Sequence, residues 1–254
     1  MGERLDGTVA LVTGASSGIG AATAQRLAAD GATVVAAARR LDRLEELVGE
    51  IAAAGGTAHA VECDVAVREQ AVGLVESTVS AHGRLDTLVN NAGVMLLGPI
   101  VGADLSDWER MISVNVDGLV HCTHAALPHL LRAAQESDRK VADIVNLSST
   151  AGRFPRVGAG VYNLTKHGIG AFSESLRQEV TARSVRVSLV EPGAVATELI
   201  DHLSPTALEG FWSRFDGVER LHAEDVADTI SYIVTRPRRV AVNEVLLRPT
   251  DQEN

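Results

Sequence analysis

The sequence has few of the residues that several protein classes need. Aromatic residues make up 3% of its 254 residues, so a folded core must be built mainly from Ala, Val, Leu and Ile. Two cysteines, Cys63 and Cys122, are too few for a disulfide framework and indicate a reducing compartment. The first seven residues lack an apolar signal region, and no apolar run reaches membrane-spanning length. We therefore expect a soluble, cytoplasmic protein.

Positive charge is also scarce. Lys and Arg number 23 against 33 Asp and Glu, which gives a formal net charge of −10. This balance argues against nucleic acid or an anionic membrane as a partner, although a local positive field would suffice for an anionic cofactor. Neither cysteine has the His and Cys neighbours that a zinc site needs, so no metal site is predicted.

Short β-branched runs alternate with helical stretches along the whole chain. Apolar residues at helical spacing mark the second of these stretches, as in Leu41, Leu44 and Leu47. This alternation predicts a single α/β domain over 1–254, a doubly wound parallel sheet of about seven strands with helices on both faces. A ligand would bind at the carboxyl ends of the strands. The predicted strands are 8–12, 33–38, 58–61, 87–90, 142–147, 185–190 and 244–247.

The first predicted strand ends in a glycine-rich turn that runs directly into an Ala-rich helix. Glycines let the backbone approach a pyrophosphate, and a helix N-terminus offers it N–H groups and partial positive charge. An ordinary strand–helix turn can also be rich in glycine, but the strand before it and the helix after it favour dinucleotide binding. The candidate contacts are Gly14, Ser16, Ser17, Gly18, Ile19 and Gly20.

The end of the second predicted strand bears on the choice between NAD and NADP. An acidic residue there binds the ribose 2′-hydroxyl of NAD, but this chain has Ala38, followed by Arg39 and Arg40. A guanidinium binds a 2′-phosphate, so the pair predicts NADP(H). The two arginines also fit the solvated start of a helix.

Two further strand ends contribute candidate cofactor contacts. Asp64, with Val65 beside it, can accept a hydrogen bond from adenine or cap the helix expected near residue 67. The small residues of the segment Asn91, Ala92 and Gly93 would let the chain pass close to the adenine ribose.

Tyr162 and Lys166 stand one helical turn apart, and Ser149 lies thirteen residues before the tyrosine. A lysine cation near a tyrosine favours the phenolate and would lower its pKa. With a serine to hold a carbonyl oxygen, the set would form an acid that protonates a carbonyl during hydride transfer. On its own, such spacing is also common on solvated helix surfaces.

Taken in order, the glycine motif, the Asn-Asn-Ala-Gly segment, Ser149, the Tyr162/Lys166 pair and Pro192-Gly193 resemble the short-chain dehydrogenase/reductase family. The resemblance covers essentially the whole chain and implies a Rossmann fold. One departure is the ending after the last predicted strand, which reads Val245 to Asp251 where many members have a Gly-rich segment.

The resemblance also implies roles for individual residues. Tyr162 would be the general acid/base, Lys166 its neighbour and a ribose anchor, and Ser149 rather than Ser148 the substrate-orienting serine. Asn115, at a local helix kink, would hold a water that relays protons to Lys166; a structural asparagine at such a kink is the alternative. The nicotinamide side of the cofactor would be contacted by Pro192, Gly193, Val195 and Thr197.

The predicted activity is reversible NADPH-dependent reduction of an aldehyde or ketone. An alcohol or 3-hydroxy acid dehydrogenase that works oxidatively, or a non-catalytic NADP-binding regulator, is the alternative; a regulator would be expected to lose Tyr162 or Lys166. The tyrosine would polarise the carbonyl without a metal.

A substrate lid is expected over 198–222, where Phe211, Trp212 and Phe215 gather. These aromatic residues could equally form a small helix packed on the core. The opposite wall of the substrate pocket would contain Met95, Leu96, Phe154 and Val157.

The resemblance further implies a homotetramer. The segment 105–132 and the helix of Tyr162 would pair across one two-fold axis, and the last strand would pair across another. The tail 246–252 would then pack near a neighbouring subunit.

Overall fold

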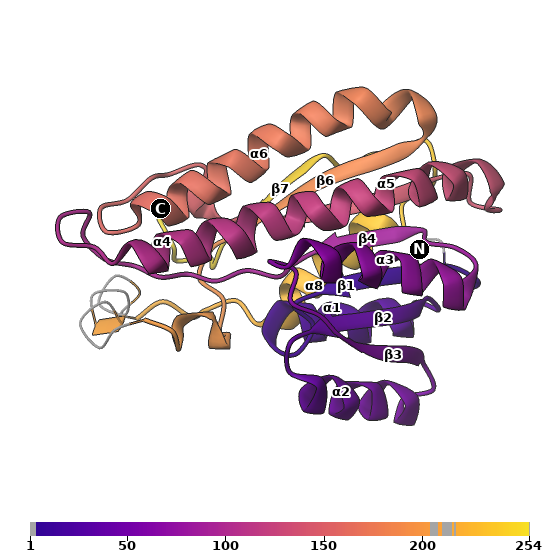
Figure 1. Cartoon of the computed structure of the whole chain (residues 1–254), viewed down its shortest axis with the longest axis horizontal. Coiled ribbons are helices and arrows are strands. Elements are labelled where there is room, and N and C mark those ends of the chain that lie inside the picture. Colours follow the sequence, from indigo (N-terminus) through magenta and orange to yellow (C-terminus); the bar gives the residue numbers. More distant parts are fainter. Residues whose placement is uncertain (1–3, 204–207, 210–214, 216, 254) are drawn as a thin grey trace.

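Seven parallel strands form one sheet in the order β3-β2-β1-β4-β5-β6-β7 in the computed structural model, which describes residues 4–203, 208–209, 215 and 217–253 (Figure 1). All seven predicted strands are present, and β2, β4, β5 and β7 have the predicted bounds. The strands are β1 Val9–Thr13, β2 Thr33–Ala38, β3 Thr57–Glu62, β4 Thr87–Asn90, β5 Ala142–Leu147, β6 Val185–Pro192 and β7 Glu244–Leu247. β6 runs two residues further than predicted because Pro192 still pairs with Leu247.

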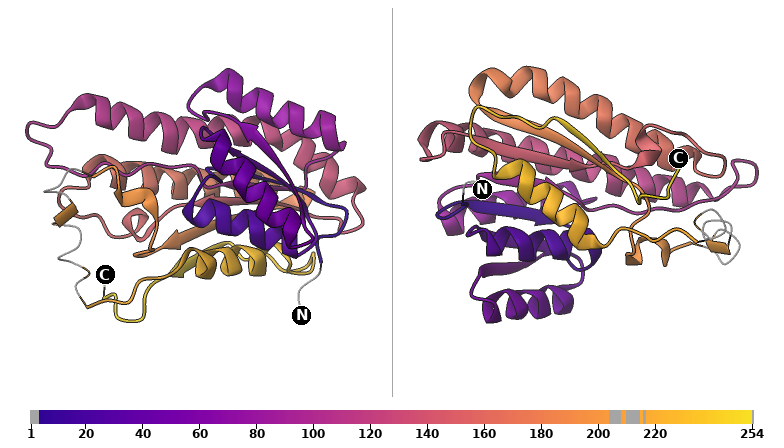
Figure 2. Two further views of the ribbon diagram at one scale, coloured as in Figure 1. Left: turned by 90° about the horizontal axis from the view of Figure 1, so that it is seen from below. Right: turned by 180° about the vertical axis from the view of Figure 1, so that it is seen from behind.

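Helices cover both faces of the sheet, as expected for parallel strands that are buried on both sides. One face carries α1 (Gly18–Ala29), α2 (Leu41–Ala53) and α8 (Ala223–Val234), and α8 packs on α1 (Figure 2). The other face carries α3 (Arg68–His82), α5 (Gly118–Glu136) and α6 (Gly160–Val180). Alternation along β1 shows the two layers directly, since Ala10 and Val12 join the first core and Val9 and Leu11 the second.

Shorter helical elements connect the larger ones. α4 (Leu105–Ile112) continues through a π-helical turn, η1 (Ser113–Asp117), into α5. Later in the chain, the described ranges include the 3₁₀ turns η2 Thr150–Gly152, η3 Thr181–Arg183 and η4 Glu198–Ile200. None of the helices within the described ranges is long and apolar enough to cross a membrane.

The order of the strands determines where a ligand can bind. β2 and β3 follow β1 in the chain and lie on one side of it in the sheet. β4 to β7 come next in the chain and lie on its other side. The loops after β1 and β4 therefore diverge at the carboxyl edge of the sheet and leave a crevice between them.

Candidate functional site

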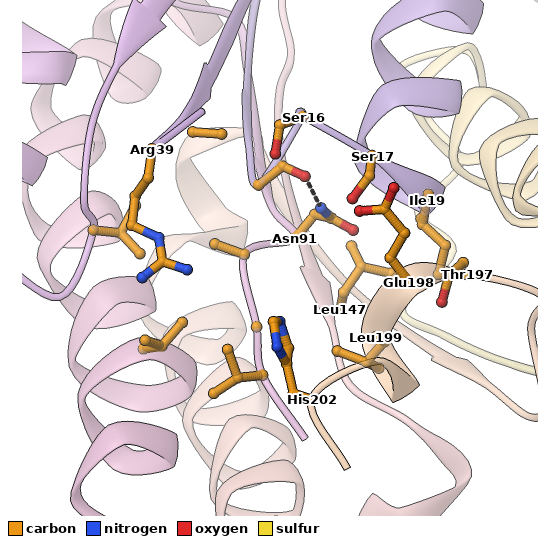
Figure 3. A pocket seen from close by; sticks show the side chains of 18 of the residues that line it. Ser16, Ser17, Ile19, Arg39, Asn91, Leu147, Thr197, Glu198, Leu199 and His202 are labelled. Carbon is orange, nitrogen blue, oxygen red and sulfur yellow. Dashed lines mark hydrogen bonds between the residues drawn. The ribbon is translucent and has the colours of Figure 1, made fainter. Parts of the chain in front are cut away.

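A cavity of about 390 Å³ opens at this carboxyl edge (Figure 3). It brings together most of the residues that the sequence nominated from five different strand ends. Predicted residues in its lining are Gly14, Ser16, Ser17, Gly18, Ile19, Arg39, Arg40, Asp64, Val65, Asn91, Ala92, Gly93, Tyr162, Lys166, Pro192 and Thr197.

The turn after β1 is shaped by close backbone contacts that require glycine. Gly14 has φ +66°, and a Cβ there would lie 2.7 Å from the Ala92 Cα. A Cβ on Gly20 would lie 2.3 Å from the Gly14 carbonyl oxygen, so Gly20 serves the packing of the loop and not the lining of the cavity. Ser17, the N-cap of α1, makes no side-chain capping bond within the described chain. The first-turn N–H groups are thus available to an anion.

The two arginines after β2 separate in the structure. Both line the cavity, and Arg39 extends into it (Figure 3), whereas Arg40 is held by other residues of the cavity lining. Arg40 Nη1 donates to Glu198 Oε2 over 2.9 Å, and Nη2 donates to Ser17 Oγ over 2.9 Å and Ser16 Oγ over 3.1 Å. The hydrogen bond with Arg40 lowers the pKa of Glu198 and keeps it ionised. Glu198 lines the cavity and is the first residue of the predicted lid, although no pairing with Arg40 was predicted.

Asp64 does not cap α3, so that part of its prediction is wrong. α3 begins at Arg68 with Val67 as its N-cap residue. The Asp64 carboxylate instead accepts from the Ala66 N–H over 3.0 Å, because a two-residue turn separates it from the helix. This position still leaves Asp64 on the cavity wall, as the adenine prediction requires.

Asn91 ties the end of β4 to the glycine-rich loop. Its Nδ2 donates to the carbonyl oxygens of Thr13 over 2.9 Å and Gly14 over 3.1 Å. Two residues later, a Cβ on Gly93 would lie 3.3 Å from Asn115 Oδ1 and 3.9 Å from Lys166 Nζ. The segment after β4 therefore connects the glycine-rich loop with the residues on α6.

Tyr162 and Lys166 lie in the first two turns of α6, and both side chains are buried. Lys166 Nζ lies 5.7 Å from the Tyr162 ring centroid and donates to the Leu147 carbonyl oxygen over 2.9 Å. Ser149 forms a hydrogen bond with the Tyr162 hydroxyl. Ser148 donates to the Lys166 carbonyl oxygen over 3.0 Å and lines the cavity, whereas Ser149 is not in the lining, so the choice of Ser149 remains a prediction.

The expected lowering of the Tyr162 pKa by Lys166 is overturned. Burial raises the pKa of Tyr162 to about 12, and the hydrogen bond with Ser149 opposes this rise. Burial also lowers the pKa of Lys166 to about 8. Both shifts have one cause, the cost of desolvating a charge, and it outweighs the attraction expected between the two groups. At neutral pH the protein therefore holds a neutral phenol beside an ammonium group.

Asn115 occupies the π-helical turn η1, where the sequence predicted a kink. Its Oδ1 accepts from the Val94 N–H over 2.8 Å, and its Nδ2 donates to the Val94 carbonyl oxygen over 2.9 Å and to Thr165 Oγ1 over 3.2 Å. These bonds join the loop after β4 to α6. The amide therefore has the structural role given as the alternative, and its link to Lys166 remains a prediction.

The segment after β6 divides into two parts. Pro192 and Thr197 line the cavity, while Gly193 and Val195 lie behind this wall. Gly193 contacts Gln252, and Val195 pairs with Leu221 in an isolated bridge. Cavity-lining residues that were not predicted as contacts are Ala38, Cys63, Val94, Val114, Leu147 and Ser148, and the predicted lid contributes Glu198, Leu199, Asp201 and His202.

The predicted lid is described in part. Leu199 and His202 face the cavity (Figure 3), and Phe215 is buried. Phe211 and Trp212 lie outside the described residues.

None of the four residues predicted for the opposite wall is in the cavity lining. Met95 packs in the same apolar cluster as Tyr162, with Leu96 partly buried against it. Val157 is 90% exposed, and Phe154 lies beneath the Arg248 guanidinium at 4.9 Å from its ring centroid. Both side chains are exposed, as their positions outside the cavity lining require. No group of three potential metal-ligating side chains occurs in the described part of the chain.

Comparisons with known proteins agree with this geometry. The family model of the short chain dehydrogenases matches residues 8–207. Serine 3-dehydrogenase of Rhizobium radiobacter is 35% identical over 98% of this chain and 96% of its own. Glycine betaine reductase ATRR of Emericella nidulans is 38% identical over 98% of this chain, which spans only 19% of that longer protein. The closed form of serine dehydrogenase complexed with NADP⁺ has a TM-score of 0.87 at 32% identity and covers 97% of both chains.

Proposed function

The chain belongs to the short-chain dehydrogenase/reductase family of NAD(P)-dependent oxidoreductases, and we propose that it is an NADPH-dependent carbonyl reductase. Its substrate would be an aldehyde or ketone, reduced reversibly to the alcohol. The observation that carries the proposal is the neutral Tyr162 phenol, which lines the cavity together with Lys166 and is hydrogen-bonded to Ser149. A phenol that keeps its proton at neutral pH is the form that can protonate a carbonyl oxygen, which favours reduction.

The residues of the cavity fit NADP(H). The glycine-rich loop and the N-terminus of α1 would hold the pyrophosphate, with Asn91 supporting the loop from β4. Arg39 would bind the 2′-phosphate, since Ala38 offers no carboxylate to repel it. The structural relative solved with NADP⁺ supports the same choice.

The catalytic residues would divide the reaction between them. When bound, NADPH supplies the hydride. Ser149 would orient the carbonyl oxygen, and the Tyr162 hydroxyl would donate its proton as that oxygen gains negative charge. Lys166 would anchor the ribose and return a proton to Tyr162, with Asn115 supporting the relay, as the family resemblance implies.

A second candidate is oxidation of a 3-hydroxy acid. It is supported by the likeness to serine 3-dehydrogenase over nearly the full length of both chains. The segments 36–40, 94–99, 126–132 and 248–252 also resemble clavulanic acid (clavaldehyde) dehydrogenase. Oxidation needs a base, and a Tyr162 pKa of about 12 makes the phenolate scarce at neutral pH, so we favour reduction. A regulator is less favoured still, because Tyr162 and Lys166 are both present at the cavity.

The test is NADPH consumption with a panel of aldehydes and ketones, and NADP⁺ reduction with 3-hydroxy acids including serine. We expect turnover with members of the first panel. Tyr162→Phe is the matched control, since it deletes the proton and keeps the ring, and it should lower turnover about 10²- to 10⁴-fold with NADPH affinity preserved. Turnover of the variant within tenfold of the parent would refute the catalytic assignment.

We further propose that the enzyme works in the cytoplasm as a homotetramer. Exposed apolar side chains on α5 and α6, among them Val120 and Leu164, support an interface on these helices. A covered interface is the simplest reason for apolar residues at such positions.

A further inference from the structure

Gly193 is a glycine because the C-terminal tail occupies the space where a side chain would stand. A Cβ at Gly193 would lie 2.3 Å from Gln252 Oε1, 3.0 Å from its Cδ and 3.2 Å from its Nε2. Gln252 is 8% exposed, unlike its neighbours Asp251 and Glu253. Its side chain therefore lies inside its own subunit, against the segment that follows β6.

The same amide holds the backbone of that segment. Gln252 Oε1 accepts a hydrogen bond from the Ala194 N–H over 2.9 Å. The Gly193 N–H donates to the Leu247 carbonyl oxygen over 2.7 Å, and the Ala196 N–H donates to that of Leu221 over 2.9 Å. Of these three bonds, the one from Gln252 is made by a side chain, so it depends on the residue type.

These three hydrogen bonds hold the segment that connects two residues of the cavity wall. Pro192 precedes the segment and Thr197 follows it, and both line the cavity. Leu221 is hydrogen-bonded to the residue that Gln252 holds, since the Leu221 N–H donates to the Ala194 carbonyl oxygen over 3.0 Å. A shift at Ala194 would therefore move both Thr197 and Leu221.

We propose that Gln252 is a positioning residue that sets the cavity wall formed by Pro192 and Thr197, by holding Ala194 from behind. The proposal rests on the proposed function, since this wall would face the nicotinamide end of the cofactor and the carbonyl substrate. It gives the C-terminal tail a role within its own subunit, in addition to the contact with a neighbour that the sequence predicted.

The first test compares substitutions at Gln252 in the full-length enzyme. Gln252→Glu keeps an acceptor oxygen of similar shape, whereas Gln252→Met fills the space without a comparable acceptor. We expect Gln252→Met to raise KM for the carbonyl substrate about tenfold with kcat less affected, and Gln252→Glu to stay within about threefold of the parent. Glu253→Ala, on the exposed neighbour, is the control and should leave both constants unchanged. Equal effects of the Glu and Met variants would overturn the proposal.

A double-mutant cycle separates the tail from a direct cofactor contact at position 193. Gly193→Ala should lower kcat/KM about tenfold or more, because its methyl group displaces the Gln252 amide. In the Gln252→Ala background the space is free, so the same change should cost less than threefold. An undiminished loss in that background would place the role of Gly193 at the cofactor and refute the proposal.

Hydrogen–deuterium exchange provides a readout that needs neither substrate nor cofactor. Exchange of the Ala194 and Leu221 amides should rise at least tenfold in Gln252→Met, with exchange in β1 and β4 unchanged. If the parent reduces no carbonyl compound but this exchange still rises, the proposed function fails and the positioning role stands. Unchanged exchange at both amides would overturn the positioning role itself.

Discussion

Arg40 Nη1 and Glu198 Oε2 lie 2.9 Å apart, and this ion pair joins the two sides of the cavity mouth. Arg40 comes from the end of β2 and Glu198 from η4, 158 residues later. Both side chains are 46% exposed, so the pair is weak, and it holds the Arg40 guanidinium against a carboxylate of the cavity lining.

Removing the acidic partner should therefore strengthen NADPH binding. Glu198→Gln deletes a negative charge from the mouth and releases Arg40 to interact with the cofactor phosphates. An exposed pair contributes about 0.2–1 kcal/mol, so Kd for NADPH should fall by up to about fivefold. Fluorescence titration at low salt measures this, and the gain should shrink in high salt. Glu109→Gln, on exposed α4, is the matched control; weaker binding in Glu198→Gln would contradict the prediction.

The two arginines should differ sharply in their effect on cofactor choice. Arg39→Asp places a carboxylate where the 2′-phosphate would bind, so NADPH affinity should fall about 10- to 100-fold while NADH binding is retained or improved. The alanine variants provide the comparison: Arg39→Ala should weaken NADPH binding at least tenfold, and Arg40→Ala no more than about threefold. Competitive titration with NADPH and NADH measures these changes in affinity. A parent enzyme that already prefers NADH would show that the prediction at the end of β2 is wrong.

As the pH rises, kcat/KM for NADPH should respond to the deprotonation of Lys166, because Tyr162 loses its proton only at a higher pH. Lys166 is charged below its pKa of about 8 and neutral above it, whereas Tyr162 stays protonated up to a pKa of about 12. For the free enzyme, kcat/KM for NADPH should be highest below pH 8 and decline above it, as the ammonium that anchors the ribose is lost. Initial rates from pH 6 to 10 test this. A flat profile to pH 10 would show that the Lys166 charge is not needed.

A substitution on α6 should disrupt assembly of the tetramer while the subunit still folds. Leu164 is 62% exposed two residues after Tyr162, and Leu164→Arg would place a charge in the proposed helix interface. We expect the parent to be a four-chain particle in multi-angle light scattering and the variant to be a smaller one, with little change in its thermal unfolding. Val101→Arg, at a 90% exposed position outside both helices, serves as the control. A fully active monomeric parent would refute the proposed tetramer.

Local sequence patterns determined the fold and the main site residues. The inner strands β1, β4, β5 and β6 are buried along their whole length, and short β-branched runs between helical stretches located all seven strands, four of them with the predicted bounds. Tyr162 and Lys166 share a helix, and their relative position depends on one helical turn. The glycine-rich turn was likewise recognisable, because its strand, loop and helix are consecutive in the chain.

Only the tertiary structure decided how residues from distant segments act on each other. It assigned Arg39 to the cavity and Arg40 to Glu198, and it placed Gln252 behind Gly193. It also reversed the expected pKa shift of Tyr162, because that shift depends on burial more than on the spacing to Lys166. Desolvation and side-chain pairing depend on everything that packs around a group in three dimensions, and the spacing along one helix or strand carries no information about these neighbours.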